Sequence, residues 1–431
     1  MSRSTPPTGC KCPRLLAAAG LLLTVAAAPA FGSGFLIYEQ GAKAMGMAGA
    51  FTAQANDGSA MFHNVGGLAF LRETRFDVGV TLIDVGDATF EGLAPFPGPG
   101  AAGEQDPGLF YPPHLYYVRP LNERLTFGIG VNAPFGLSTE WANPETWPGR
   151  YISAFAELRA FDFNPSIGWK LADDFGVGFG VVGRISDVSL LQFVPQRIPF
   201  NQTVVDVARA DLESDFDTGF GWNVGVLHQV GKYLSWGLSY RSKIEIDYGG
   251  DAVFTQIPTG NPQLDALVAA AIPFGQQLPI ETSIEFPDVA SVGVALGLTR
   301  RVLLEADVNW VGWSSFDVIT LAFTSAPQFT TVIPNDWDDA YNYRLGVQVG
   351  EGPSYWRFGY IYDETPQPAE SVGPLLPDAD RNDYTIGYGN RRFDVALMYV
   401  DFGERTTTTN RDDFFGTYKT DIWLLGLTVK F

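Results

Sequence analysis

Apolar and polar residues alternate along most of the chain after about residue 74. Phe175, Val177, Phe179 and Val181 are separated by single residues, and the chain ends on the same alternation between Trp423 and Phe431. A period of two residues predicts β-strands with one apolar face. A soluble β-sandwich produces the same alternation, so the connections between strands must distinguish the two.

Short and long connections alternate along the chain. Short links fall at residues 122–123, 172–174, 231–232, 299–301, 350–353 and 389–391, and long links fall at 91–112, 138–156, 191–217, 251–279, 323–338, 365–381 and 404–417. Short turns on one side and long loops on the other are typical of an outer-membrane barrel. The alternative, a large soluble all-β exoprotein, would leave many aromatic residues of the outer face in water.

The segments between these links predict fourteen strands. They cover residues 75–90, 113–121, 124–137, 157–171, 175–190, 218–230, 233–250, 280–298, 302–322, 339–350, 354–364, 382–389, 392–403 and 418–431. Most are longer than the roughly 9–11 residues that a tilted transmembrane strand needs. The predicted fold class is therefore all-β membrane, a 14-stranded antiparallel transmembrane β-barrel over residues 74–431 with long extracellular loops.

The N-terminus has the composition of an export signal. Arg3, Lys11 and Arg14 precede an apolar run from Leu15 to Val25, and Ala28 and Ala30 follow as an A-x-A cleavage pattern. We expect residues 1–30 to be a signal peptide. Both cysteines, Cys10 and Cys12, lie within it, so the mature chain is expected to fold without disulfides.

Residues 31–73 lack the two-residue period and are rich in glycine and alanine. A barrel of fourteen strands would otherwise enclose a wide lumen. We therefore expect this segment to form an N-terminal hatch, or plug, in the lumen. The alternative is a disordered periplasmic tail, which the apolar residues Met45, Met47, Phe51 and Phe62 disfavour.

Composition and charge narrow the function. The chain has 18% charged and 46% hydrophobic residues and a net charge of −20. It has enough apolar surface to fold, and it shows no basic face for a nucleic acid, so none is expected as a partner. The acidic residues gather in the predicted loops, where solvation is the favoured interpretation.

The third predicted strand contains Asn132, Ala133, Pro134, Phe135 and Gly136 in succession. Proline cannot donate to a β-ladder, so this sequence predicts a bulge or a break. Unpaired backbone is costly in hydrocarbon and persists where it lines a cavity. Two interpretations stay open: a break that lines an opening, or a proline at the outer end of the strand.

Two of the long loops show helical spacing. Val204, Val207 and Leu212 in the third loop, and Leu264, Leu267 and Val268 in the fourth, predict one helix each. Asn261 and Pro262 would be the N-cap and the first helical residue. These helices would either collect apolar ligands or close the barrel mouth.

An ordered set of motifs resembles the FadL family of outer-membrane transporters for long-chain fatty acids and hydrophobic compounds. The motifs span the mature chain: Gly34-Phe35, the stretch from His63 to Leu68, 133–139, 147–151, 164–166, 221–225, 239–244, 337–341 and 377–381. The resemblance implies a fourteen-strand barrel with a hatch and a kinked third strand that opens a lateral portal. It also implies passive uptake, with ligand captured by the third and fourth loops, held in the lumen and released sideways into the membrane.

The resemblance places functional roles on particular residues of this chain. The portal would be formed by Asn132, Pro134, Phe135 and Gly136, the hatch turn by Asn64, Val65 and Gly66, the interior ligand site by Arg184 and Phe35, and the collecting surface by Val204, Val207, Leu264, Leu267 and Val268. The hatch turn departs from the family, because Asn64-Val65-Gly66 stands where the family usually has Asn-Pro-Ala. A basic residue of the family's ninth strand aligns with Thr320, which leaves room for neutral hydrocarbons as ligands.

The parity of the strands predicts which basic residues face the lumen. If Val177 and Phe179 face lipid, Arg184 points into the lumen. By the same alternation, Arg241, Lys243, Arg344 and Arg357 are also expected to point inward. Inward guanidinium groups could hold a carboxylate by charge-assisted bonds. The alternative for each is an ion pair with a lumen carboxylate such as Glu305 or Asp307.

Other functions and partners follow from what the sequence lacks. Three histidines and no Ser-His-Asp pattern or metal spacing predict that the chain is no enzyme and needs no cofactor or metal. An outer-membrane lipase is the enzyme alternative, and a general diffusion porin or a channel for neutral aromatic or alkane hydrocarbons is the transport alternative. The aspartates in 335–339 and 412–413 are candidate Ca²⁺ ligands, though solvation by water is the favoured interpretation.

The expected partners are a hydrophobic small molecule, outer-membrane lipid and lipopolysaccharide, and the barrel-assembly machinery. That machinery would recognise the strand ending at Phe431. We expect the protein to be a monomer.

Overall fold

The computed structural model of the chain describes residues 34–198 and 203–431. The predicted signal peptide lies outside these residues and stays a prediction. Helices are few and short: the α-helices are α1 (Ala42–Met45), α2 (Ala60–His63) and α3 (Pro262–Ala271), and the 3₁₀ helices are η1 (Val65–Phe70), η2 (Trp313–Ser315), η3 (Pro327–Phe329) and η4 (Ala369–Ser371). No helix in the described ranges has the length and apolarity needed to cross a membrane.

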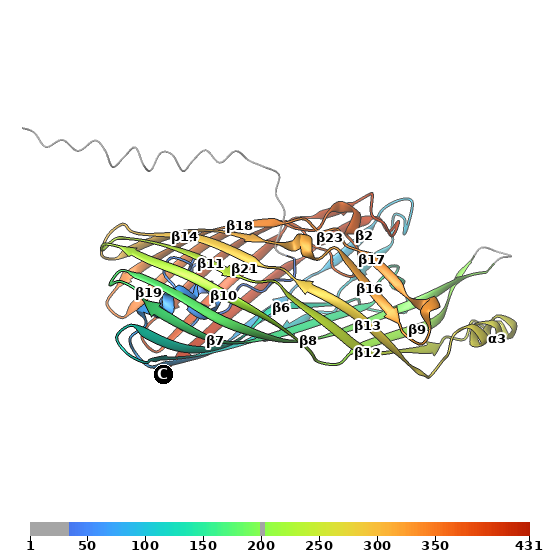
Figure 1. Ribbon diagram of the computed structural model, residues 1–431. Helices are drawn as coiled ribbons and strands as arrows, with labels where there is room; N and C mark the ends of the chain where they lie inside the picture. Colours follow the sequence, from blue (N-terminus) through green and yellow to red (C-terminus); the bar gives the residue numbers. More distant parts are fainter. Residues whose placement is uncertain (1–33, 199–202) are drawn as a thin grey trace, which may run out of the picture. The chain divides into compact units, whose positions relative to one another are not determined.

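Strands make up most of the described chain (Figure 1). Their bounds are β1 (Arg75–Val85), β2 (Thr89–Gly92), β3 (Ala102–Glu104), β4 (Gly108–Phe110), β5 (Pro113–Pro120), β6 (Leu125–Glu140), β7 (Phe155–Lys170), β8 (Phe175–Arg197), β9 (Val204–Ser214), β10 (Asp217–Val230), β11 (Leu234–Arg241), β12 (Ile244–Gln256), β13 (Gln277–Phe286), β14 (Val289–Gly297), β15 (Val302–Val311), β16 (Val318–Phe323), β17 (Thr331–Pro334), β18 (Ala340–Glu351), β19 (Ser354–Asp363), β20 (Arg381–Gly389), β21 (Phe393–Phe402), β22 (Arg405–Thr407), β23 (Gly416–Lys419) and β24 (Asp421–Lys430).

Twenty of these strands form one closed antiparallel sheet. Several follow one another across a two- to six-residue break, as β9 and β10 or β11 and β12 do, and together they make a barrel wall of fourteen strands, as predicted. The first and last wall strands close the barrel, with Asp77 opposite Lys430 and Val85 opposite Ile422. A separate sheet of β22, β23, β2 and β3 is built from the long loops.

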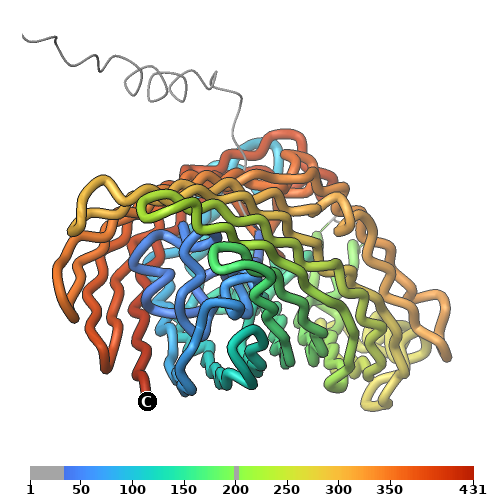
Figure 2. The backbone as a smooth tube through the Cα atoms, turned by 60° about the vertical axis from the view of Figure 1, so that its left-hand side comes forward, coloured from blue at the N-terminus to red at the C-terminus, as the bar shows by residue number. Residues whose placement is uncertain are grey.

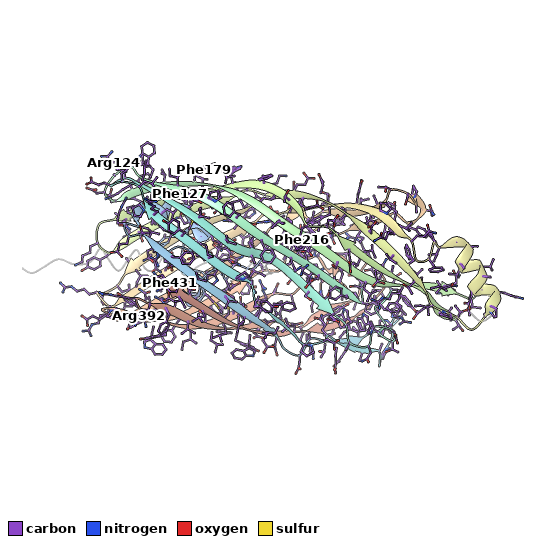
Figure 3. All side chains as sticks on the ribbon, turned by 90° about the horizontal axis from the view of Figure 1, so that it is seen from below. Arg124, Phe127, Phe179, Phe216, Arg392 and Phe431 are labelled. Carbon is purple, nitrogen blue, oxygen red and sulfur yellow. The ribbon has the colours of Figure 1, made fainter. Side chains whose placement is uncertain are left out.

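The two faces of the wall differ as the alternation predicts. Along β7 and β8 buried residues alternate with more exposed ones, and the exposed residues include Phe163, Ile167, Phe179 and Val181. In an outer-membrane barrel, an outward-facing apolar band of this kind contacts the acyl chains of the lipid. Figure 3 shows Arg124 and Arg392, from two short turns, at the same end of the barrel as Phe431.

One of the two predicted loop helices is wrong and the other is confirmed. The residues from Val204 to Leu212 form strand β9, which pairs with β8 on one side and β12 on the other. The β-branched Val204, Val205 and Val207 favour strand over helix, and the extended wall gives them partners. In the next loop α3 begins as predicted, with the Asn261 side chain accepting hydrogen bonds from the amides of Gln263 and Leu264.

The segment from Gly34 to Leu71 folds inside the barrel wall, and nearly all its residues are buried (Figure 2). Small residues allow this fit. A Cβ on Gly66 would lie 2.9 Å from the backbone of Gly225 in β10, so plug and wall touch through bare backbone. This placement is what a hatch requires.

The hatch turn is stabilised by Asn64 without a following proline. Its Nδ2 donates to the carbonyls of Thr52 (2.7 Å) and Val226 (3.0 Å), and its Oδ1 accepts from the amide of Gly66 at the start of η1 (3.0 Å). One side chain thus joins two parts of the plug to β10. Val65, at the family's proline position, is buried.

Two carboxylates of β15 anchor the middle of the plug. Asp307 Oδ2 accepts from the amides of Phe51 and Thr52, both at 2.9 Å. Glu305 Oε1 accepts from the amides of Ala53 (2.6 Å) and Gln54 (3.2 Å). These acids therefore bind plug backbone, whereas the sequence left open that they pair with the lumen arginines.

His63 is an uncharged member of the plug. Its ring lies 5.0 Å from the rings of Tyr38 and Phe62, and neither ring nitrogen has a hydrogen-bond partner among the described residues. Burial lowers its pKa from about 6.5 to about 3. Because the folded pKa lies below the unfolded one, the neutral ring contributes stability in full above about pH 6.5, and this stability is lost as pH falls toward 3.

Acidification is therefore expected to loosen the plug. Between pH 7 and pH 5 the His63 contribution should fall by about 2 kcal/mol. His63→Phe keeps an aromatic ring that cannot be protonated, so its thermal midpoint in detergent should drop less over this pH range than that of the wild type. Equal drops in the two proteins would show that His63 does not govern the acid response.

Candidate functional site

The wall has a window between β5 and β6. Their pairing ends at Leu115 opposite Val131, although β6 continues to Glu140. The chain before β4 closes the gap again at its outer end, where Gln105 bridges to Trp141. The free edge of β6 lies between these two points.

The first residues of the described chain cover this edge from inside. The amide of Ile37 donates to the carbonyl of Pro134 (2.8 Å), and the amide of Gly136 donates to the carbonyl of Phe35 (3.1 Å). Leu36 stands opposite Phe135 as an isolated β-bridge. The N-terminal segment therefore takes the place of a missing neighbour strand.

Pro134 causes a bulge within β6. Its pairing with β7 shifts register between Asn132, opposite Asp162, and Phe135, opposite Ala160, so β6 holds one extra residue there. Because β6 continues to Glu140, Pro134 does not stand at the strand's outer end, and that alternative is wrong. Asn132, Phe135 and the small Gly136 surround the bulge, beside the window, where the portal was predicted.

A cavity of about 890 Å³ joins the lumen to the window. On the window side it is lined by 109–113 and 136–139, and on the lumen side by wall residues such as Val400, Ile422 and Leu424. Most of its lining is apolar. It has the size and character of a site for a hydrophobic small molecule.

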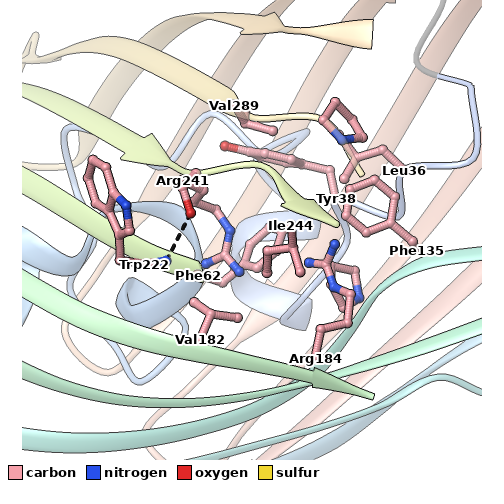
Figure 4. A pocket seen from close by; sticks show the side chains of 13 residues that line it. Leu36, Tyr38, Phe62, Phe135, Val182, Arg184, Trp222, Arg241, Ile244 and Val289 are labelled. Atoms are coloured by element: carbon pink, nitrogen blue, oxygen red, sulfur yellow. Dashed lines mark hydrogen bonds between the residues drawn. The ribbon is translucent and has the colours of Figure 1, made fainter. Parts of the chain in front are cut away.

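Arg184 and Arg241 meet at one buried carboxylate, that of Asp162. Figure 4 shows the two arginines among the side chains that line the small cavity beside them. Arg184 donates from Nε and Nη2 to Asp162, at 2.7 and 2.9 Å, and Arg241 Nη2 donates to the same carboxylate at 3.0 Å. Two guanidinium groups share one acid, which leaves a surplus positive charge. The cavity between them is only about 10 Å³, room for one water at most.

Aromatic rings cover both guanidinium groups. Arg184 lies 4.5 Å from the ring centre of Phe135 and 4.7 Å from that of Phe286, and Arg241 lies 4.7 Å from that of Phe62. Cation–π contacts of this kind fix the guanidinium planes. Phe135 belongs to both this cluster and the window, so the cluster and the window are adjacent.

Phe35 lies in a cluster of aromatic side chains. Its ring centre is 4.7 Å from that of Trp313, 5.3 Å from that of Phe316 and 5.9 Å from that of Phe135. The ring holds the N-terminal segment beside the window. Phe135 lines both the large cavity and the small cavity beside Arg184, so the two cavities meet at its ring.

Lys243 does not join this cluster, which corrects the parity count. It is exposed and binds Glu285 at 2.9 Å. Arg241 and Ile244 are both buried, so the side-chain alternation changes phase at the break between β11 and β12. Thr320, which aligns with a basic residue of the family, is also exposed, in β16.

Arg344 and Arg357 do face inward, where they are bound to protein groups. Arg344 donates to the carbonyl of Ala48 in the plug (3.0 Å) and lies over the ring of Tyr38. Arg357 pairs with Asp394 at 2.8 Å. Both arginines stabilise the interior.

The structure brings only some of the predicted collecting residues together. Val207 of β9 and Val268 of α3 are buried in one apolar cluster, and Leu264 packs against it. Val204 and Leu267 are exposed outside it. A β-strand and a helix thus form the apolar surface that two helices were expected to form.

The family motif at 377–381 contains Asp378 and Arg381, but the sequence did not predict that they form the polar end of the large cavity. Arg381 and Asp383 of β20, Asp363 of β19 and Asp378 line it beside the plug. The alternation of polar residues at 381, 383 and 385 is the signal that could have found them. Among the described residues, no group of three or more acids, histidines or cysteines is arranged to hold a metal ion.

The family model described as outer membrane protein transport protein (OMPP1/FadL/TodX) matches residues 23–431. The chain belongs to this family. It is an outer-membrane β-barrel, as predicted from the alternation of short turns and long loops.

Individual relatives are distant in sequence and similar in fold. The long-chain fatty acid transport protein of Escherichia coli is 24% identical over 374 residues, which cover 82% of each chain. The crystal structure of a Pseudomonas aeruginosa FadL homologue superposes with a TM-score of 0.81 at 21% identity, covering 93% of this chain and 99% of that one. The Pseudomonas putida toluene transporter TodX superposes with a TM-score of 0.68 at 14% identity and the same coverage.

Proposed function

We propose that this protein carries hydrophobic small molecules, long-chain fatty acids or similar compounds, passively across the outer membrane. The observation that carries the proposal is the largely apolar cavity of about 890 Å³ that connects the lumen to the window between β5 and β6. The relatives are named for fatty acids and for toluene. Both ligands are apolar enough to leave a barrel sideways into lipid.

The path begins at the apolar cluster of β9 and α3, passes through the cavity and ends at the window. For ligand to pass, the stretch from Phe35 to Gln40 must leave the edge of β6. It is held there by backbone hydrogen bonds such as those of Ile37 and Gly136, by the Gln40 side chain bound to Ala133, and by the packing of Phe35 among aromatic rings. Each hydrogen bond is worth about 1 kcal/mol net, and every one of these contacts is reversible, so the gate opens by thermal motion without an energy source.

Further parts of the proposal concern chemistry and partners. We propose transport without enzymatic activity or cofactor, since the family model and the relatives describe transport proteins. The outward apolar band would contact outer-membrane lipid and lipopolysaccharide, and the barrel-assembly machinery would insert the chain as a monomer.

Uptake by cells tests the function. A strain that lacks its own transporter for hydrophobic compounds should take up labelled oleate or toluene when it expresses this chain. A strain expressing an empty vector is the control. Absence of uptake, together with steady ion conductance in planar bilayers, would favour the diffusion porin.

The role of Arg184 is tested by Arg184→Ala. If the surplus positive charge of the cluster holds the ligand carboxylate, oleate binding should weaken roughly ten- to hundred-fold, as expected for a lost charge-assisted hydrogen bond. Arg209→Ala removes an exposed arginine that pairs with Asp211 and is the control. Unchanged oleate affinity in the Arg184 variant would remove Arg184 from the site.

A further inference from the structure

Positive charge gathers on one side of the barrel end that carries the short turns. Four turns follow one another around the wall from β10 to β21, and their basic residues are Lys232, Arg300, Arg301, Arg391 and Arg392. With the strand ends beside them, these turns contain one exposed acid, Glu351. The chain as a whole has a net charge of −20, so these five residues, the basic arc, run against its overall balance.

The other side of this end is balanced in charge. The turns between β5 and β6 and between β7 and β8, with the strand ends beside them, contain Arg119, Arg124, Lys170, Glu123, Asp173 and Asp174. Lys170 pairs with Asp173 at 2.9 Å. Figure 3 shows Arg124 of this side and Arg392 of the basic arc at the same end of the barrel.

Most of the basic arc is free to bind an anion. Arg301 pairs with Glu351, so the one exposed acid of these turns is already used. The other four arc side chains are exposed, and none of them forms an ion pair with another residue of the described ranges. Their charge is therefore not compensated by the protein.

Aromatic rings on the outer face of the wall lie next to the basic arc. The ring of Trp356 in β19 is 5.1 Å from that of Tyr388 in β20, which is 6.1 Å from that of Phe393 in β21. Such rings mark the boundary between hydrocarbon and water in a membrane barrel. Phe393 directly follows Arg392, so the basic arc begins where the head groups of the lipid lie.

We propose that the basic arc binds anionic phospholipids of the periplasmic leaflet, with the lipid phosphate held by the unpaired arginines and Lys232. A phosphodiester carries one negative charge, and its oxygens accept from guanidinium and ammonium groups. The acyl chains would lie along the apolar wall beyond the aromatic rings. The proposed function includes contact with lipid in general, and this proposal goes beyond it by naming the lipid class and the residues.

The length of the turns favours lipid over an anionic polymer such as the cell wall. Only two to four residues separate the strands at these four turns. Each residue extends the chain by about 3.5 Å at most, so the basic side chains stay near the leaflet. Basic residues this close to an anionic lipid surface are attracted to it, and the attraction falls off within a Debye length.

Native mass spectrometry of the purified protein in a non-ionic detergent tests the proposal. Titration with palmitoyl-oleoyl phosphatidylglycerol and palmitoyl-oleoyl phosphatidylcholine compares two lipids with the same acyl chains and different head-group charge. We expect the phosphatidylglycerol to bind roughly ten-fold or more tightly. Equal affinity overturns the proposal. Glycerol phosphate, which lacks acyl chains, should bind far more weakly, and equally tight binding would make the arc a site for free phosphate esters.

Paired variants test the place of the site. Arg391→Gln together with Arg392→Gln should weaken phosphatidylglycerol roughly ten-fold and leave phosphatidylcholine unchanged. Arg119→Gln together with Arg124→Gln removes the same number of charges from the balanced side and is the matched control. Equal losses in the two double variants would show that net charge, and no particular site, attracts the lipid, which overturns the proposal.

A second pair of arc residues keeps the test decisive if the first variant does not fold. Lys232→Gln together with Arg300→Gln should show the same selective loss, and heat-dependent gel mobility reports whether each barrel is folded. Binding to purified peptidoglycan that the arc variants lose, without any preference for phosphatidylglycerol, would assign the arc to the cell wall and overturn the lipid assignment. None of these outcomes depends on which hydrophobic compound the lumen carries.

Discussion

Deletion of Pro134 is expected to abolish uptake of hydrophobic compounds while the barrel still assembles. The deletion removes the extra residue between Asn132 and Phe135, so that β6 pairs with β7 in continuous register and the residues after the bulge keep their faces. Without the bulge, β6 can extend its pairing with β5 as far as Pro113, which narrows the window. Uptake of labelled oleate should fall to that of cells without the protein.

The deletion needs a control that shortens the chain elsewhere. Deleting Gly100, in the loop between β2 and β3, should leave uptake intact, because no wall pairing depends on it. Outer-membrane abundance and the heat-dependent gel mobility of the folded barrel should match the wild type for both deletions. Full uptake by the Pro134 deletion would show that ligand does not leave through this window.

The second large effect is expected from Glu305→Ala together with Asp307→Ala. These carboxylates accept four backbone amides of the plug between Phe51 and Gln54. Without them the amides are buried and unpaired, at about 1–3 kcal/mol each. The plug should therefore loosen, and single-channel recordings in planar bilayers should show frequent conducting openings that the wild type lacks.

Isosteric variants separate the acceptor from the charge. Glu305→Gln and Asp307→Asn keep an amide oxygen at each position and should show an intermediate conductance. Asp401→Ala, at an exposed wall position, should behave as the wild type does. If the double alanine variant stays as closed as the wild type, these two acids do not hold the plug.

The barrel was predictable because its signals are local and repeated. The alternation in β7 and β8, the short turns and the Asn261-Pro262 start of α3 each depend on neighbours within a few residues. The predicted helix at Val204–Leu212 was wrong because the decisive contact is distant in sequence. Apolar residues at mixed spacing fit a helix or a strand, and only pairing with β8 and β12 selects the strand.

The contacts of the candidate site were harder to predict from the sequence than the barrel. Parity placed Arg184 and Arg241 inside but could not show that both bind Asp162, and it failed at Lys243 because a two-residue break between β11 and β12 shifts the alternation. The polar end of the cavity depends on β19, β20 and the plug lying together. The alternation of polar residues at 381, 383 and 385 marks a row of lumen-facing side chains, but such rows are ordinary in a barrel and do not by themselves indicate a ligand site.

Whether ligand passes through the window can be tested by locking the N-terminal segment to β6 reversibly. Leu36 and Phe135 face each other as a non-hydrogen-bonded antiparallel pair, so Leu36→Cys with Phe135→Cys places two thiols within disulfide range. The native cysteines, Cys10 and Cys12, both lie in the predicted signal peptide. Oxidised cells should take up no labelled oleate and should recover uptake after reduction, with each single cysteine variant unaffected by oxidant. Undiminished uptake by the oxidised, cross-linked protein would show that ligand does not leave through the window.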